Sequence, residues 1–293
     1  MISAVFNQPF EEQLAFFKQK VSLPTQRWDD IQRAAHDRAF VVAGAMKADL
    51  ITDLRGAVEK AIAQGTTLDE FRRDFKNIVQ KHGWTGWKGE GTKAGEAWRT
   101  KVIWETNLLT SHAAGRYAQM TDPELLATCP YWQYRHADYV ARPRPLHVSW
   151  HGLVLPANHP WFKTHWPPNG WGCHCKVRAL SARDIERLNL SISTPPDDGF
   201  DEHIDAKTGA VTQTPAGIDR GWDYAPGRTW APALEKYPEA LARQVVNEYA
   251  RDGVFERWYH KLEAMVENWK QDPRFSGLKS DKFVTVKFFR TER

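Results

Sequence analysis

A proline-broken segment at residues 129–178 is the strongest constraint on the fold. Six prolines between residues 143 and 168 exclude a long helix there and allow only short strands. The same segment holds all three cysteines, five of the 14 tryptophans and six of the 11 histidines. Because few backbone ladders can form, we expect stacked aromatic rings, with or without a metal ion, to hold this irregular core together.

Helical patterns precede this core. The spacing of apolar residues predicts four helices, and Thr67 and Glu70 form a capping box at the start of the third. Gly65 and Gly83 are natural stops for the second and third helices. The four predicted helices cover residues 10–23, 26–62, 67–82 and 96–120.

The region after the core is less regular. The pattern at residues 181–188 predicts a short capped helix. Residues 191–232 are rich in Pro, Gly, Asp and Thr, which predicts an extended surface excursion, a long loop that leaves the core. Two more helices, near 234–250 and 254–270, and an alternating terminal strand at 282–288 complete the prediction.

These patterns predict an α+β fold in three parts. Residues 1–122 form a mainly helical N-terminal half. Residues 123–232 form an irregular core, rich in Trp, His and Cys, with short strands and extended loops. Residues 233–293 form a helical C-terminal arm with a terminal strand.

Composition excludes several classes of protein. No apolar run approaches the roughly 20 residues of a membrane helix, and the first residues lack the pattern of a signal peptide, so no membrane partner is expected. Three cysteines cannot form a disulfide framework. A net charge of +4 is too small for the chain to act as a polycation.

The strongest chemical pattern is Cys173-His174-Cys175 together with the histidines before it. A Cys-x-Cys pair in an extended segment turns both sulfurs to one side, and thiolates with imidazoles are the natural ligands of structural zinc. The other two ligands would come from His147 and His151, or from His165. The alternative is a packed loop in which the thiols are small buried hydrophobes and the histidines bind backbone carbonyls.

An enzyme is a weaker hypothesis. Ser111 and His112 are helix neighbours that point about 100° apart, so they do not form a nucleophile–base pair. A Cys/His/acid trio that uses Asp138 within residues 136–175 would make a nuclease or hydrolase, but no spacing selects one trio. No complete catalytic motif is present, and we expect no enzymatic activity.

Nucleic-acid contact is a third hypothesis. Residues 129–178 contain six basic residues and one acidic residue, and several of the basic residues alternate with aromatic residues along the sequence. Arginine suits phosphate and aromatic rings suit bases, although arginine also stacks on tryptophan inside proteins. The candidate DNA contacts are Arg142, Arg144, Lys176 and Arg178.

Several stretches resemble the phage Mu F-like minor head proteins, also called phage head morphogenesis proteins. Residues 168–177, around Cys173 and Cys175, are similar to the closing signature of that family, and residues 142–156 to its other half. The similarity extends through the helical half and past the core. Further similar stretches are residues 23–30, 36–44, 65–72, 106–116 and 224–227.

The resemblance implies a structural virion protein, present in few copies at the portal and inner capsid surface of the phage head. The implied partners are the portal and major capsid proteins, with double-stranded phage DNA as a further partner, and synthesis would take place in the host cytoplasm. Relatives often carry cysteines where this chain has Arg144 and His147, which favours a structural zinc ion. The resemblance thus adds weight to His147, Cys173 and Cys175, with His165 taken as fourth ligand and His151 as its competitor.

Overall fold

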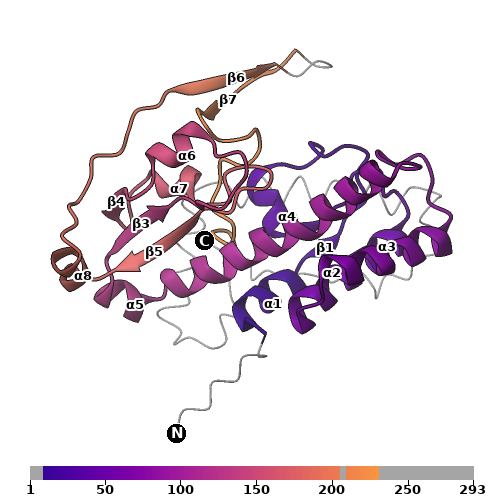
Figure 1. The fold of residues 1–293 in the computed structure, drawn as a ribbon, viewed down its shortest axis with the longest axis horizontal. Coiled ribbons are helices and arrows are strands. Elements are labelled where there is room, and N and C mark those ends of the chain that lie inside the picture. The colour runs from indigo at the N-terminus through magenta and orange to yellow at the C-terminus, as the bar shows by residue number, and fades with distance from the viewer. Residues whose placement is uncertain (1–8, 205–208, 231–293) are drawn as a thin grey trace, which may run out of the picture.

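The computed structural model describes residues 9–204 and 209–230 (Figure 1). Helices gather at one end of the molecule and a small sheet lies at the other. Helix α4 (Lys93–Met120) runs from the first part to the second. The predicted C-terminal arm, residues 233–293 with its helices and strand, lies outside the described residues.

The helical part is built from four helices around one apolar core. Helix α1 (Glu11–Lys18) packs on α4, and α2 (Ala48–Gln64) packs on α3 (Leu68–His82). The predicted capping box is confirmed, since the Thr67 and Glu70 side chains each bond the other's backbone amide. Gly65 and Gly83 end α2 and α3 in the left-handed conformation, as predicted. Buried members of this core include Phe17, Phe40, Leu50, Leu54, Phe71, Phe75 and Ile103.

The predicted helix over residues 26–62 is wrong in its first half. Helix α2 begins only at Ala48. Before it the chain forms a 3-10 helix, η1 (Arg33–Asp37), and a short strand, β2 (Ala39–Phe40). Strand β2 pairs in parallel with β1 (Val21–Ser22), which keeps the chain extended here.

A buried carboxylate gives the tertiary reason for this departure. Asp37 is 0% exposed, and its carboxylate accepts hydrogen bonds from the backbone amides of Gly227 and Thr229 and from the Thr229 hydroxyl. A buried carboxylate without such donors would cost several kcal/mol, so the chain follows a path that places Asp37 against this distant segment. Local alanine spacing carries no information about that contact.

The second part contains a three-stranded antiparallel sheet in the order β4-β3-β5. The central strand is β3 (Tyr131–Arg135), and its neighbours are β4 (Val154–Pro156) and β5 (Lys176–Leu180). Trp132 pairs with Leu155 on one side and with Ala179 on the other. Four short helices surround the sheet: α5 (Pro123–Thr128), α6 (Pro145–Ser149), α7 (Phe162–His165) and α8 (Ala182–Arg187).

Aromatic rings fill the core beside this sheet. Trp132, Trp150, Trp161 and Trp166 are buried, and the ring centroids of Trp132 and Trp166 are 4.9 Å apart. The prediction that large rings supply burial where ladders are short is therefore confirmed for these four. The fifth tryptophan, Trp171, is 42% exposed and belongs to the surface.

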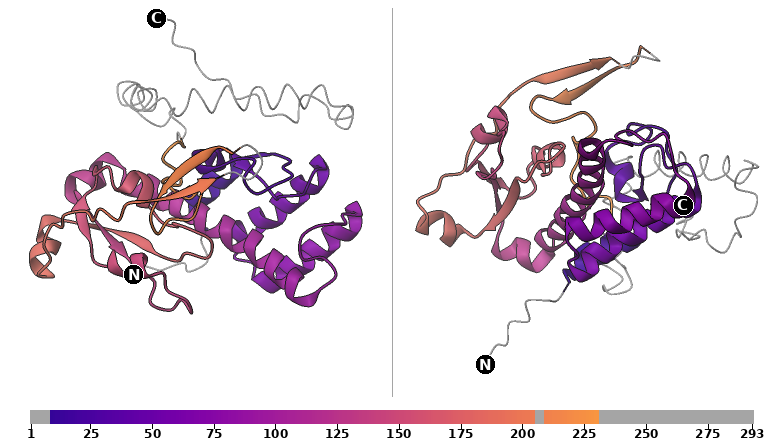
Figure 2. Two further views of the ribbon diagram at one scale, coloured as in Figure 1. Left: turned by 90° about the horizontal axis from the view of Figure 1, so that it is seen from above. Right: turned by 45° about the vertical axis from the view of Figure 1, so that its right-hand side comes forward.

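The excursion at residues 191–232 includes a two-stranded hairpin, β6 (Phe200–Ile204) and β7 (Val211–Pro215), which projects from the body (Figures 1 and 2).

The mixture of helices and short strands confirms the α+β class. The predicted boundary after residue 122 falls between α4 and α5, and the division into domains stays a prediction. Among the described residues, no helix is both long and apolar enough to cross a membrane.

Candidate metal centre

Two cysteines lie at the entrance to β5. Cys173 follows Gly172, whose φ of 67° turns the chain, and Cys175 directly precedes the strand. Both thiols are free and buried, at 5% and 9% exposed. The alternation of the extended segment turns both sulfurs inward and leaves His174 between them to point elsewhere.

His147 on α6 meets both sulfurs. Its Nδ1 atom lies 3.6 Å from Sγ of Cys173 and 3.7 Å from Sγ of Cys175. The ligand atoms of these three buried residues all lie within 4.8 Å of one another, close enough to share a metal ion. The other ring nitrogen of His147, Nε2, donates a hydrogen bond to the Gly217 carbonyl at 2.9 Å. This bond fixes the tautomer, because with the proton on Nε2 the Nδ1 lone pair faces the sulfurs.

The two thiols hold their protons unequally. The hydrogen bond from Cys173 lowers the pKa of Cys175 despite its burial. The same contact with Cys175, together with burial, raises the pKa of Cys173. The pair therefore favours one thiolate, at Cys175, which is the form of cysteine that binds metals.

The structure does not bring His165 to this group. The His165 ring stacks on Trp161 with centroids 4.2 Å apart, and its Nδ1 lies 3.1 Å from the Trp161 carbonyl. Burial lowers the pKa of His165 to about 4. His151 instead accepts a hydrogen bond at Nδ1 from the backbone amide of His136. His174 donates from Nε2 to the Glu105 carboxylate at 3.1 Å.

His136, which is not among the predicted ligands, lies beside the sulfurs in the structure. Its Nδ1 lies 3.5 Å from Sγ of Cys175. His136 follows the last residue of β3, and Arg135 pairs with Lys176 at the start of β5. The antiparallel register therefore sets His136 opposite Cys175. The spacing of residues along the chain does not show which strands pair, so the sequence contained no signal for this contact.

The chain resembles known proteins over most of its length. Residues 52–178 match the family described as "Phage Mu protein F like protein". The putative capsid assembly protein F of Escherichia phage Mu is 36% identical over 263 residues, which is 81% of this chain and 58% of that protein. The Mu-like prophage FluMu F protein of Haemophilus influenzae is 31% identical over 264 residues, 80% of this chain and 63% of that protein.

The chain belongs to the phage Mu F-like family. The resemblance read from the sequence is thereby confirmed, and the matched residues 52–178 contain all of the candidate metal ligands. This Mu F-like chain spans about 58–63% of the length of these two relatives. No solved structure matches it.

The basic residues of this Mu F-like chain fall into two groups. Lys176 and Arg178 are exposed and alternate along β5, and the exposed Arg135 is paired opposite Lys176. Arg144 instead lies 2.7 Å from the Asp219 carboxylate, which also accepts the backbone amide of Trp171. Arg142 is exposed on the loop before α6.

The serine and the acid of the enzyme hypothesis lie in different surroundings. Ser111 is fully buried and donates to the Asn107 carbonyl, in the manner of a packed helix residue. Asp138 is exposed. Behind the cysteines, Nε2 of His147 meets a backbone carbonyl rather than a carboxylate.

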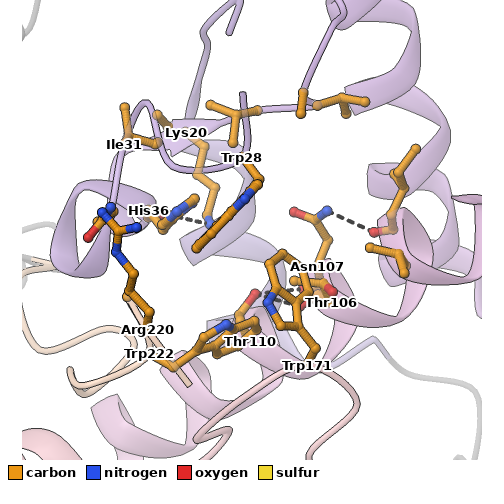
Figure 3. Close-up of a pocket in the computed structure, with 18 of the residues that line it drawn as sticks. Lys20, Trp28, Ile31, His36, Thr106, Asn107, Thr110, Trp171, Arg220 and Trp222 are labelled. Atoms are coloured by element: carbon orange, nitrogen blue, oxygen red, sulfur yellow. Dashed lines mark hydrogen bonds between the residues drawn. The ribbon is translucent and has the colours of Figure 1, made fainter. Parts of the chain in front are cut away.

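A cavity of about 120 Å³ lies between η1, α4 and the segment before Trp222 (Figure 3). Trp28, Trp171 and Trp222 form aromatic walls, and the ring centroids of Trp171 and Trp222 are 5.1 Å apart. Lys20 reaches the cavity, where its Nζ donates to the His36 carbonyl and burial lowers its pKa to about 8. Nothing in the sequence indicated this cavity, because its walls come from four separate segments.

Proposed function

We propose that this protein is a structural minor head protein that acts in phage head assembly. The observation that carries the proposal is the 36% identity to a protein of phage Mu named as a putative capsid assembly protein. Its place would be the virion, at the portal and inner capsid surface, after synthesis in the host cytoplasm. The portal and major capsid proteins would be its partners.

An exposed aromatic pair supports a docking role. Trp28 and Trp171 are each 42% exposed, and their ring centroids are 6.2 Å apart. The guanidinium of Arg220 lies 6.0 Å from the Trp28 ring. Tryptophan and arginine are the residue types most enriched at the centres of protein interfaces. This pair is therefore the surface at which we place the contact with another head protein.

Particle assembly tests the role. In the phage or prophage that encodes the chain, deletion of the gene should abolish filled heads, and the wild-type gene supplied in trans should restore them. The double variant Trp28→Ser and Trp171→Ser should fold normally but enter particles at least tenfold less. Trp98→Ser is the matched control, since Trp98 is a similarly exposed tryptophan on α4. Normal filled heads without the gene would refute the role.

Double-stranded DNA is a further proposed partner. The exposed basic residues Lys176 and Arg178 on β5 favour it, as does the exposed Arg142 on the loop before α6. Substituting alanine for both Lys176 and Arg178 should weaken DNA binding. The salt dependence of the affinity should then correspond to about two fewer released counterions. Arg72→Ala with Arg73→Ala on α3 is a control of equal charge change. Equal affinity at low and high salt would exclude DNA contact, and DNA cleavage that disappears in Cys173→Ala would support the nuclease alternative instead.

A further inference from the structure

The three sulfur–nitrogen distances at the cysteines have the value expected around a tetrahedral zinc ion. Zinc–sulfur bonds of about 2.3 Å and zinc–nitrogen bonds of about 2.0–2.1 Å give a tetrahedral S···N edge of about 3.6 Å. The observed distances are 3.6 and 3.7 Å from His147 to the two sulfurs, and 3.5 Å from His136 to Cys175. The ligand atoms of His147, Cys173 and Cys175 all lie within 4.8 Å of one another, as ligands of one centre do, and His136 meets this group at Cys175.

One hydrogen bond does not explain both contacts made by Nδ1 of His147. The Nδ1 lone pair of His147 accepts a single proton, yet two sulfurs approach it at nearly equal distance. Nε2 of the same ring already carries the proton donated to Gly217. A hydrogen bond joins that Nδ1 atom to one sulfur only, whereas a cation at the shared centre would bind the imidazole and both sulfurs together.

We propose that His136, His147, Cys173 and Cys175 form a structural zinc site, with His136 rather than His165 as the fourth ligand. Structural zinc takes four protein ligands, and His147 with the two cysteines supplies three. His136 touches Cys175, while His165 is held against Trp161. His136 is also the partly exposed member of the set, so it closes the site on the solvent side.

The site joins three segments that the short sheet holds only weakly. His136 follows β3, His147 lies on α6, and the cysteines precede β5. The Gly217 carbonyl, bonded to His147, attaches a fourth segment to the same centre. Such a clamp explains how a core with strands of three to five residues keeps one arrangement. It is independent of the proposed assembly role.

Metal titration of the purified full-length chain tests the site. Zinc should bind one per chain, and cobalt should give the intense visible bands of a tetrahedral site with thiolate charge transfer. His136→Asn should lower the affinity for zinc at least 100-fold in a chelator competition. Loss of an outer-shell partner alone lowers metal affinity 10–100-fold, and His136 is proposed as a direct ligand. His165→Asn and His174→Asn are matched controls from the same core and should bind zinc as the wild type does.

A gain-of-ligand variant covers the case in which His136→Asn fails to fold. His136→Cys should retain tetrahedral cobalt and add one thiolate to the charge-transfer intensity. The proposal is overturned if wild-type protein binds no zinc, or if His165→Asn loses zinc while His136→Asn keeps it. A cobalt spectrum of His136→Cys identical to that of the wild type also overturns it. Loss of head assembly with zinc binding intact, or the reverse, separates this proposal from the proposed function.

Discussion

At the scale of single residues, two buried histidines of the same proline-broken segment have different environments. His147 turns Nδ1 toward two sulfurs because its Nε2 bonds the Gly217 carbonyl. His165 lies flat against the Trp161 ring and contacts that residue's carbonyl. The backbone carbonyl that each ring contacts thus decides which histidine faces the cysteines. The spacing of residues along the chain does not show which carbonyl that is.

The environment of His165 predicts acid sensitivity. Its pKa is lowered by burial from 6.5 to about 4, so the unfolded chain binds a proton that the folded chain does not between those values. The free energy of unfolding should therefore fall as the pH drops from about 6.5 to 4, by up to about 3 kcal/mol from this group. Urea denaturation at several pH values measures the loss.

The matched variant is His165→Phe, which keeps a ring against Trp161 but cannot titrate. Its stability should fall less steeply below pH 6.5 than that of the wild type, while the contributions of other groups cancel in the comparison. Parallel pH profiles for the two proteins would show that His165 is not the source of the sensitivity.

At the scale of elements, the predicted helix ends that rest on local signals match the structure. The helix predicted over residues 26–62 is absent at residues 26–47, because contacts with distant segments decide the path of the chain there. Helix α3 begins at its capping box and ends at Gly83, both visible in the sequence. Residues 26–47 carry an equally helical alanine pattern, but there the chain pairs β1 with β2 and directs Asp37 toward Gly227. The buried carboxylate and the strand pairing outweigh propensities that differ by tenths of a kcal/mol per residue.

The capping box of α3 gives the prediction at this scale. Thr67→Ala removes the hydroxyl that accepts the Glu70 amide, and should lower the free energy of unfolding by about 1 kcal/mol. Thr67→Ser keeps the hydroxyl and should stay close to the wild type. Chemical denaturation followed by circular dichroism measures both, and an equal loss in the two variants would contradict a capping role.

At the scale of the whole molecule, α4 connects the two cores. Ile103 near its middle belongs to the helical core, and Met120 at its end belongs to the tryptophan core. The segment at Gly227 closes over α4, where a Cβ on Gly227 would lie 2.7 Å from the Ala114 Cα. Long-range contacts of this kind tie the last described residues to the N-terminal half.

That close approach predicts a strong effect of Gly227→Ala. The residue has a φ of +85°, and the added methyl also meets backbone atoms of α4. Gly221→Ala is the matched control, because its φ of +83° carries the same conformational strain while its added Cβ meets Gln32 only at ordinary distances of 3.6 Å and above. We expect the control to cost about 1–2 kcal/mol. Gly227→Ala should cost about 1–3 kcal/mol more from overpacking. Equal losses in thermal or urea unfolding would show that α4 moves aside freely.

The sequence by itself determined the features that depend on neighbours in the chain. Prolines between residues 143 and 168 limited the core to short strands, glycines and the Thr67 cap set helix ends, and the Cys173/Cys175 spacing placed two sulfurs together. The tertiary structure decided what depends on pairing between distant segments. The β3–β5 register brought His136 to Cys175, and the stacking of His165 on Trp161 kept it away. These outcomes follow from burial and register, whose energies arise only when segments far apart in the sequence meet.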